Sequence, residues 1–245
     1  MTGSNAPRRG QSVSELLNTA SQVFRVSLLK CLPFAMIAVL CVEIPNIYWV
    51  MTGHSFPRGM PVDIGYWWLS LATSALAVYI FSAMMLRQLY VSGGFAVNAK
   101  QEMTVSVRRL PGLLMSWVLA QVSVAVGLLL LILPGIFLFV CYLVLLPVIL
   151  LEGQINPVLA LWRCVALVRP NWWRVCAAFV IALLAIGICF IIFAALLAIL
   201  ATLLTDLGPA FQAIAAAASI AAAAMVFVFF SALALAIHSS ANNSA

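Results

Sequence analysis

One carboxylate, Glu43, falls inside a long apolar stretch of the sequence. It lies about 20 Å along a helix from Lys30, which places it within the apolar zone of a membrane. An ionisable group there is costly, so Glu43 is a candidate proton site, or a site for a cationic substrate or lipid headgroup. The alternative is a structural glutamate, protonated or hydrogen-bonded to Asn46, to Gln121 or to a backbone carbonyl that a nearby proline leaves unpaired.

A second carboxylate, Glu152, ends an apolar stretch and is followed by the basic residues Arg163, Arg169 and Arg174. The first interpretation is an ion-pair network that fixes a short surface helix to the rest of the protein. The second is a phosphate clamp for anionic lipid, because guanidinium groups bind phosphate through two parallel hydrogen bonds and basic clusters next to membranes attract anionic headgroups.

Other basic residues also lie beside apolar stretches and form a secondary basic cluster: Arg25, Lys30, Arg108 and Arg109. In a soluble protein the net charge of +6 would suggest nucleic acid. Here lipid phosphates and the rules of membrane insertion explain the same charges, so we expect membrane lipids as partners and no nucleic acid.

Groups that could support catalysis or hold a metal are sparse. The two histidines, His54 and His238, fall in a loop and a tail that we expect on opposite sides of a membrane. The six cysteines lack the spacing of a zinc site and are expected to be small buried side chains. Because motifs for hydrolases, metalloproteases and phosphate-binding loops are also missing, we expect no enzyme, no metal and no cofactor.

The composition is that of a membrane protein. Hydrophobic residues make up 66% of the chain and charged residues 7%, whereas soluble domains carry roughly a quarter charged residues. In lipid the backbone must satisfy its own hydrogen bonds, and the apolar runs lack the alternation of barrel strands. The predicted fold class is therefore all-α, a polytopic membrane protein.

Hydrophobicity and helix signals divide the chain into one membrane domain, 12–237, between a flexible leader, 1–11, and a tail, 238–245. Two amphipathic interfacial helices are expected, and Ser12 with Glu15 and Asn156 with Pro157 give their start signals. Pro134 and Gly135 should form the turn between spans three and four, and a water-exposed connection should run from 92 to 112. The interfacial helices are placed at about 12–26 and 157–168, and the six spans at about 28–50, 66–87, 113–133, 136–151, 172–204 and 209–237.

Charge predicts the orientation. Of the twelve lysines and arginines, only Arg58 falls in a connection that follows an odd-numbered span. The others lie in the N-terminal segment or in the connections after spans two and four. By the positive-inside rule, both termini are expected on the cytoplasmic side.

The two interfacial helices precede their spans in the same way, which predicts an internal repeat. At one constant offset Leu17 matches Leu161, Arg25 matches Arg169 and Lys30 matches Arg174. The unit would be an interfacial helix followed by a two-span hairpin. The connection from 100 to 109 is a candidate third, degraded copy.

The second half of the chain resembles a family. The order of residues is similar to that in the YciC-like bacterial inner-membrane proteins and in the related membrane domain of glycerophosphoryl diester phosphodiesterases, with Cys164 in place of the usual serine. The resemblance implies a six-helix inner-membrane protein of a family with largely unassigned function. No phosphodiesterase domain is attached, so that activity does not carry over. The matching residues are Pro134, Gly135, Ile136, Pro147, Glu152, Ala160, Leu161, Arg163, Leu167, Asn171, Trp172, Trp173 and Arg174.

These features favour a non-enzymatic inner-membrane protein that maintains the envelope, handles lipid or serves as the membrane subunit of a transport assembly. The first alternative is a small secondary transporter that uses Glu43. The second is an enzyme acting on lipid headgroups. The alanine-rich last span should pack closely on another helix, either in the same chain or, through self-association or a protein partner, in another.

Overall fold

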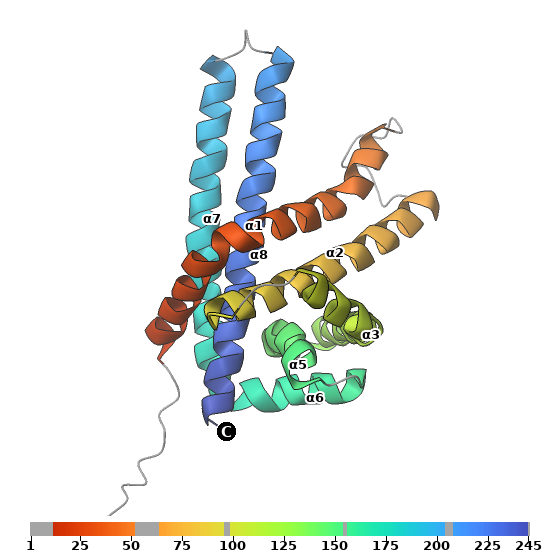
Figure 1. The fold of residues 1–245 in the computed structure, drawn as a ribbon, viewed down its shortest axis with the longest axis vertical. Coiled ribbons are helices and arrows are strands. Elements are labelled where there is room, and N and C mark those ends of the chain that lie inside the picture. Colours follow the sequence, from red (N-terminus) through yellow and green to blue (C-terminus); the bar gives the residue numbers. More distant parts are fainter. Residues whose placement is uncertain (1–11, 52–63, 96–98, 154–155, 204–207, 245) are drawn as a thin grey trace, which may run out of the picture.

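A computed structural model describes residues 12–51, 64–95, 99–153, 156–203 and 208–244. This part of the chain is all-helical and contains no strand (Figure 1). The expected leader and most of the connection between the first two spans lie outside the described residues. The helices are α1 (Val13–Met51), α2 (Ile64–Ser92), α3 (Ala99–Leu130), α4 (Ile132–Cys141), α5 (Leu145–Glu152), α6 (Pro157–Val168), α7 (Trp172–Leu203) and α8 (Gly208–Ser244), with the 3₁₀ turns η1 (Tyr142–Val144) and η2 (Arg169–Asn171).

Six helical segments are long and apolar enough to cross a membrane, which confirms an all-α, multi-pass membrane protein. The fourth of these segments combines α4, η1 and α5, and the fifth combines α6, η2 and α7. The segments are Val13–Trp49, Ile64–Ser92, Glu102–Leu130, Ile132–Glu152, Pro157–Leu200 and Ile214–Asn242.

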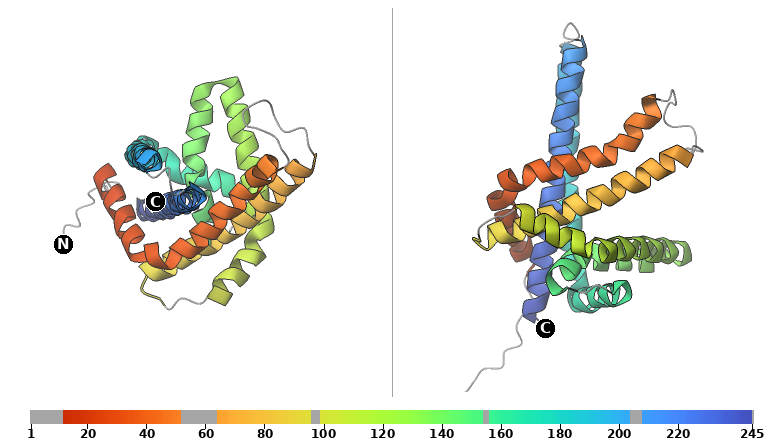
Figure 2. Two further views of the ribbon diagram at one scale, coloured as in Figure 1. Left: turned by 90° about the horizontal axis from the view of Figure 1, so that it is seen from above. Right: turned by 45° about the vertical axis from the view of Figure 1, so that its right-hand side comes forward.

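The first interfacial helix and the first span are one continuous helix, α1, so the boundary expected near residue 27 is wrong. The predicted capping box is present: the backbone N–H of Ser12 donates to Glu15 at 2.8 Å, and Glu15 N–H donates to the Ser12 hydroxyl at 3.3 Å. The helix bends along its length (Figure 2). Pro33 lies inside it, and a proline removes one backbone hydrogen bond and bends a helix without ending it.

The turn between spans three and four is at Leu131, not at Pro134 and Gly135, so that prediction is wrong. Leu131 has extended backbone angles, while Pro134 and Gly135 lie in the first turn of α4. Proline is tolerated there because the first N–H groups of a helix have no partner within the helix. Gly135 instead allows α3 and α4 to touch: a Cβ on it would lie 2.7 Å from the backbone nitrogen of Leu128.

The connection expected from 92 to 112 is mostly helical. Helix α2 ends in a Schellman motif in which Phe95 N–H donates to the Tyr90 carbonyl at 2.9 Å and Gly94 adopts a φ of +72°. Helix α3 begins at Ala99 and continues through Pro111. One face of its first turns is buried, where Glu102 packs against α2, while Lys100, Met103 and Thr104 on the same turns are exposed as predicted.

Helix α6 has the predicted start, since the Asn156 side chain accepts a hydrogen bond from Val158 N–H at 3.1 Å and Pro157 is the first helical residue. The turn η2, which contains Pro170, separates α6 from α7. No such break separates the expected interfacial helix from the first span within α1, so the repeated unit stays a prediction. The tail expected from 238 is wrong, because α8 continues to Ser244 and His238 is buried.

The long helices do not share one direction. Helices α7 and α8 run upright, α1 and α2 cross them obliquely, and α3 and α4 lie across their lower part (Figure 2). The start of α1 and the end of α8 lie towards the same end of the molecule, and the end of α8 lies beside α6 (Figure 1). Helix α8 packs against α1 within the chain, where buried Ala224 and Val228 meet Cys31 and Ala35, while Ala216 and Ala217 of its alanine-rich part are exposed.

Candidate functional site

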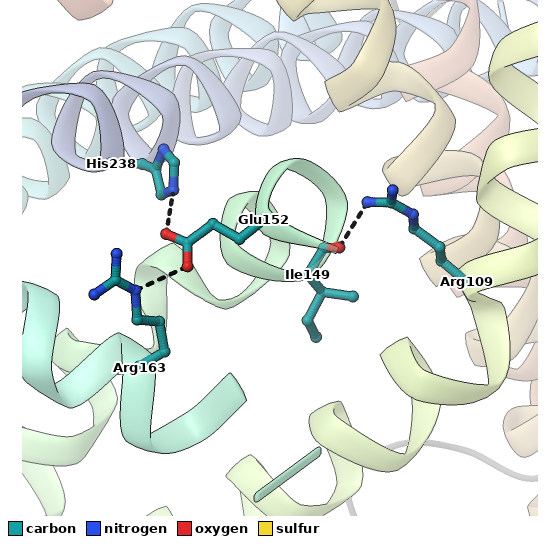
Figure 3. Close-up of polar contacts among 5 residues, drawn as sticks. All are labelled: Arg109, Ile149, Glu152, Arg163 and His238. Carbon is teal, nitrogen blue, oxygen red and sulfur yellow. Dashed lines mark hydrogen bonds and ion pairs between the residues drawn. The ribbon is translucent and has the colours of Figure 1, made fainter. Parts of the chain in front are cut away.

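Three side chains from three helices meet at the end of the molecule where α6 lies. Glu152 is the last residue of α5, and its Oε2 pairs with Nε of Arg163 on α6 at 2.8 Å. Its Oε1 lies 3.2 Å from Nε2 of His238 on α8 (Figure 3). Glu152 therefore joins α5, α6 and α8 through both carboxylate oxygens, and we call these three residues the Glu152 cluster.

Local sequence positions this cluster. Gly153 follows Glu152 with a φ of +73°, a conformation that glycine adopts without strain and that ends α5. Asn156 and Pro157 then start α6, so that Arg163 returns to the end of α5. The sequence predicted the pairing of Glu152 with Arg163 but not its contact with His238, which falls in the tail expected from 238.

Arg109 binds the same end of α5. Its Nη1 donates to the carbonyl oxygen of Ile149 at 2.8 Å (Figure 3). It also donates to the carbonyl oxygen of Leu150. The last carbonyls of a helix lack partners within the helix, and a cation there also interacts favourably with the helix dipole. Arg109 thus belongs to the structure around Glu152 and not to a separate basic cluster.

The other predicted basic residues lie apart from Glu152. Arg169 in η2 and Arg174 in α7 are both exposed, and the two oxygens of Glu152 bind Arg163 and His238. In the secondary basic cluster, Arg25, Lys30 and Arg108 are exposed, and no hydrogen bond or ion pair joins these side chains in the described structure. The secondary basic cluster therefore stays a prediction, except that Arg109 binds the end of α5.

Glu43 is bound by a residue of its own helix. Asn46 Nδ2 donates to Glu43 Oε2 at 3.1 Å, and Asn46 is one of the partners that the structural interpretation of Glu43 offered. Gln121 lies on an exposed position of α3, and no hydrogen bond connects it to Glu43 in the part of the chain that the structure describes. Of the two side chains offered as partners of Glu43, the described structure thus pairs it with Asn46 and not with Gln121.

A buried ion pair that the sequence did not predict connects α2 to α3. Arg87 Nε lies 3.1 Å from Glu102 Oε2, and the exposed fractions of these side chains are 14% and 0%. The Arg87 guanidinium also lies 4.3 Å from the centre of the Phe34 ring, and its Nη1 donates to the Lys30 carbonyl at 3.4 Å. The pair therefore joins α1, α2 and α3.

A neutral network also joins helices in the interior. Gln88 of α2 donates through Nε2 to the Ser27 hydroxyl at 3.0 Å and to the Val228 carbonyl at 3.1 Å. The hydroxyl of Ser231 donates to Gln88 Oε1. All three side chains are buried, and their mutual hydrogen bonds fix α1, α2 and α8 relative to one another.

A large apolar cavity lies between α7 and α8 on one side and α2, η1 and α5 on the other, and we call it the α7/α8 groove. Its volume is about 480 Å³, within the range of ligand pockets. Half-exposed Leu183 lies on its lining, so the groove opens to the surroundings of the molecule. Its lining residues are Phe81, Met85, Tyr142, Leu143, Leu146, Phe179, Leu183, Val226, Phe227, Phe230, Ser231, Leu233, Ala234 and Ile237.

Two further apolar cavities adjoin this groove. One, of about 380 Å³, shares Phe81, Leu146 and Phe227 with it. The other, of about 340 Å³, lies between α4 and α6 and shares Tyr142. Glu43 lines none of these three cavities, although its neighbour Val42 lines the second.

The chemistry of the cluster is that of charge pairing. His238 bonds to Glu152, but no hydroxyl or thiol of the described residues bonds to His238 as an activated nucleophile would. Nor do the described residues contain a group of three histidine, cysteine, aspartate or glutamate side chains that could hold a metal ion. Arg163 is the accessible member of the cluster, with 43% of its side chain exposed.

Comparisons of the chain with models of protein families, with curated proteins and with solved structures found no match. The resemblance to the YciC-like proteins therefore stays a prediction.

Proposed function

We propose that this protein is a non-enzymatic, multi-pass protein of the bacterial inner membrane that handles lipid and so helps to maintain the envelope. The observation that carries the proposal is the position of an open apolar groove beside a charged cluster at one end of the molecule. An apolar cavity with a few polar groups at its edge suits a ligand with both characters, and a membrane supplies phospholipids as such ligands.

The proposal includes membership of the YciC-like family and an orientation with both termini in the cytoplasm. The excess of lysine and arginine in the expected cytoplasmic segments supports this orientation. The common location of the α1 start and the α8 end is compatible with it (Figure 1). The Glu152 cluster would then lie at the cytoplasmic surface, where anionic lipids attract basic side chains. The same non-enzymatic membrane protein could also act as the membrane subunit of a transport assembly, which is the second role that we propose.

Among the alternatives, the geometry favours a lipid-headgroup enzyme over a transporter. Such an enzyme needs several polar groups at one interface, and Glu152, His238 and Arg163 meet there. Both oxygens of Glu152 are engaged and His238 is buried, which supports a binding role over catalysis. A transporter that uses Glu43 gains no support, since Glu43 bonds to Asn46 and lines none of the three apolar cavities.

Deletion of the gene from its own bacterium tests the proposed function. We expect a changed phospholipid composition and a more permeable envelope, measured by lipid mass spectrometry and by uptake of a dye that intact membranes exclude. Wild-type protein and the Glu43→Gln variant should both restore the normal state. Unchanged lipids and permeability after deletion would overturn the proposal, and failure of Glu43→Gln to restore them would favour the transporter.

A further inference from the structure

The α7/α8 groove and the Glu152 cluster are continuous along one face of α8. Phe227, Phe230, Ser231 and Ala234 line the groove at helical spacing. His238 lies four residues after Ala234, one turn further along the same face. Because His238 bonds to Glu152, one end of the groove leads to the cluster.

The groove also leads towards α6 through Tyr142. This residue lines both the groove and the smaller cavity between α4 and α6. Trp162 lies on the wall of the smaller cavity, is largely exposed, and directly precedes Arg163. An exposed tryptophan beside an arginine is typical of the level at which lipid headgroups lie.

Arg163 retains its capacity to bind an anion at this end. Its Nε donates to Glu152 at 2.8 Å, and its two terminal nitrogens point away from that carboxylate (Figure 3). Arginine presents a planar fork of donors that matches phosphate oxygens, and Glu152 holds this fork in place. The side chain is partly exposed, so a phosphate can reach it from outside.

We propose that the α7/α8 groove binds a diacyl anionic phospholipid, whose acyl chains occupy the groove and whose phosphate binds the guanidinium of Arg163. The inference rests on the proposed lipid-handling function and names its ligand. The apolar lining excludes water from the chains and supplies the binding energy, which scales with the apolar area buried. Arg163 supplies the preference for an anionic headgroup over a zwitterionic one.

Helix α7 offers a matched pair of positions that tests the groove. Leu183 lines it, whereas its neighbour Leu184 does not, and both leucines face outward with exposed fractions of 50% and 60%. Leu183→Trp should fill the groove, while Leu184→Trp adds the same side chain elsewhere on the same helix. Leu183→Phe and Leu184→Phe form a second, smaller pair for the case that the tryptophan variant does not fold.

The experiment is native mass spectrometry of the full chain in detergent with added dipalmitoyl phosphatidylglycerol or dipalmitoyl phosphatidylcholine. We expect wild-type protein to prefer phosphatidylglycerol. Leu183→Trp should weaken its binding about tenfold, a change of about 1.4 kcal/mol. Leu184→Trp should bind as wild type does. Arg163→Gln should remove the preference between the two lipids while leaving binding of the acyl chains.

Two further ligands, one without acyl chains and one with a single chain, distinguish binding of the headgroup from binding of the acyl chains. Glycerophosphoglycerol, which has the headgroup without acyl chains, should bind far more weakly than the diacyl lipid, and lysophosphatidylglycerol should lie between them. Equal binding by the two members of the leucine pair, or no preference for the anionic lipid in wild-type protein, would overturn the inference. If the deletion strain nevertheless shows altered lipids, the proposed function stands and only this site is wrong.

Discussion

Two kinds of carboxylate in this protein have different partners. Glu102 and Glu152 form ion pairs with residues of other helices. Glu43, in the second half of α1, instead bonds to Asn46, one turn further along the same helix. A carboxylate that joins helices depends on the tertiary structure and supports it, whereas one bound within its own helix does neither. The difference predicts how strongly each substitution should affect the protein.

The largest effect is expected at the buried pair of Arg87 and Glu102. Glu102→Leu leaves the Arg87 charge without its partner in the interior, and we expect the free energy of unfolding to fall by about 3 kcal/mol. Reversible unfolding in mixed micelles measures it. The double variant Arg87→Met with Glu102→Leu should recover most of this loss, because two apolar side chains leave no buried charge. If Glu102→Leu is as stable as wild type, the Arg87 and Glu102 pair does not support the tertiary structure and the comparison with Glu43 is wrong.

Glycine substitutions should also differ in their effect on stability, depending on whether the glycine lies where two helices touch. Gly135→Ala places a methyl group against the backbone of α3, and we expect a loss of about 2 kcal/mol. Gly187→Ala on α7 meets no atom within 4 Å and should be neutral or stabilising by up to about 1 kcal/mol. Unfolding in the same micelles compares the two. Equal effects would show that α3 and α4 do not approach closely at Gly135.

A smaller effect is expected at Glu152. Glu152→Gln weakens the contacts to Arg163 and His238, but water screens the partly exposed arginine, so the expected loss is about 1 kcal/mol. Exposed Arg169, which does not pair with Glu152 in the described structure, provides the control, because Arg169→Gln should change stability by less than about 0.5 kcal/mol. Thermal unfolding of the three proteins side by side measures the difference, and a larger loss for Arg169→Gln than for Glu152→Gln would contradict the assignment.

The smallest effect is expected at Glu43. Glu43→Gln preserves the shape of the side chain and leaves Asn46 an acceptor, so stability should change by less than about 0.5 kcal/mol. The variant should also restore the envelope of the deletion strain. Normal folding together with loss of that activity would make Glu43 a functional site and reverse the comparison.

The sequence predicted what depends on local spacing. The capping box of Ser12 and Glu15, the helix start at Asn156 and Pro157, and the pairing of Glu152 with Arg163 all involve residues close along the chain. The fold class and the number of apolar segments followed from composition and length.

The predictions failed where long-range contacts decide the structure. His238 is 86 residues from Glu152, and Arg87 is 15 residues from Glu102 across a connection expected to be exposed. Pro134 and Gly135 have the composition of a turn, but the contact of Gly135 with Leu128 depends on the approach of two helices. No periodic pattern in one segment reports such contacts.

The lipid that stays with the protein after extraction from its own membrane tests the central claim most directly. Mass spectrometry of the co-purified lipids, compared with the bulk membrane, gives the ratio of anionic to zwitterionic phospholipid. We predict several-fold enrichment of anionic lipid with wild-type protein and with Leu184→Trp, and little enrichment with Leu183→Trp. A co-purified pool with the composition of the bulk membrane in all three proteins would contradict a lipid-binding role for the α7/α8 groove.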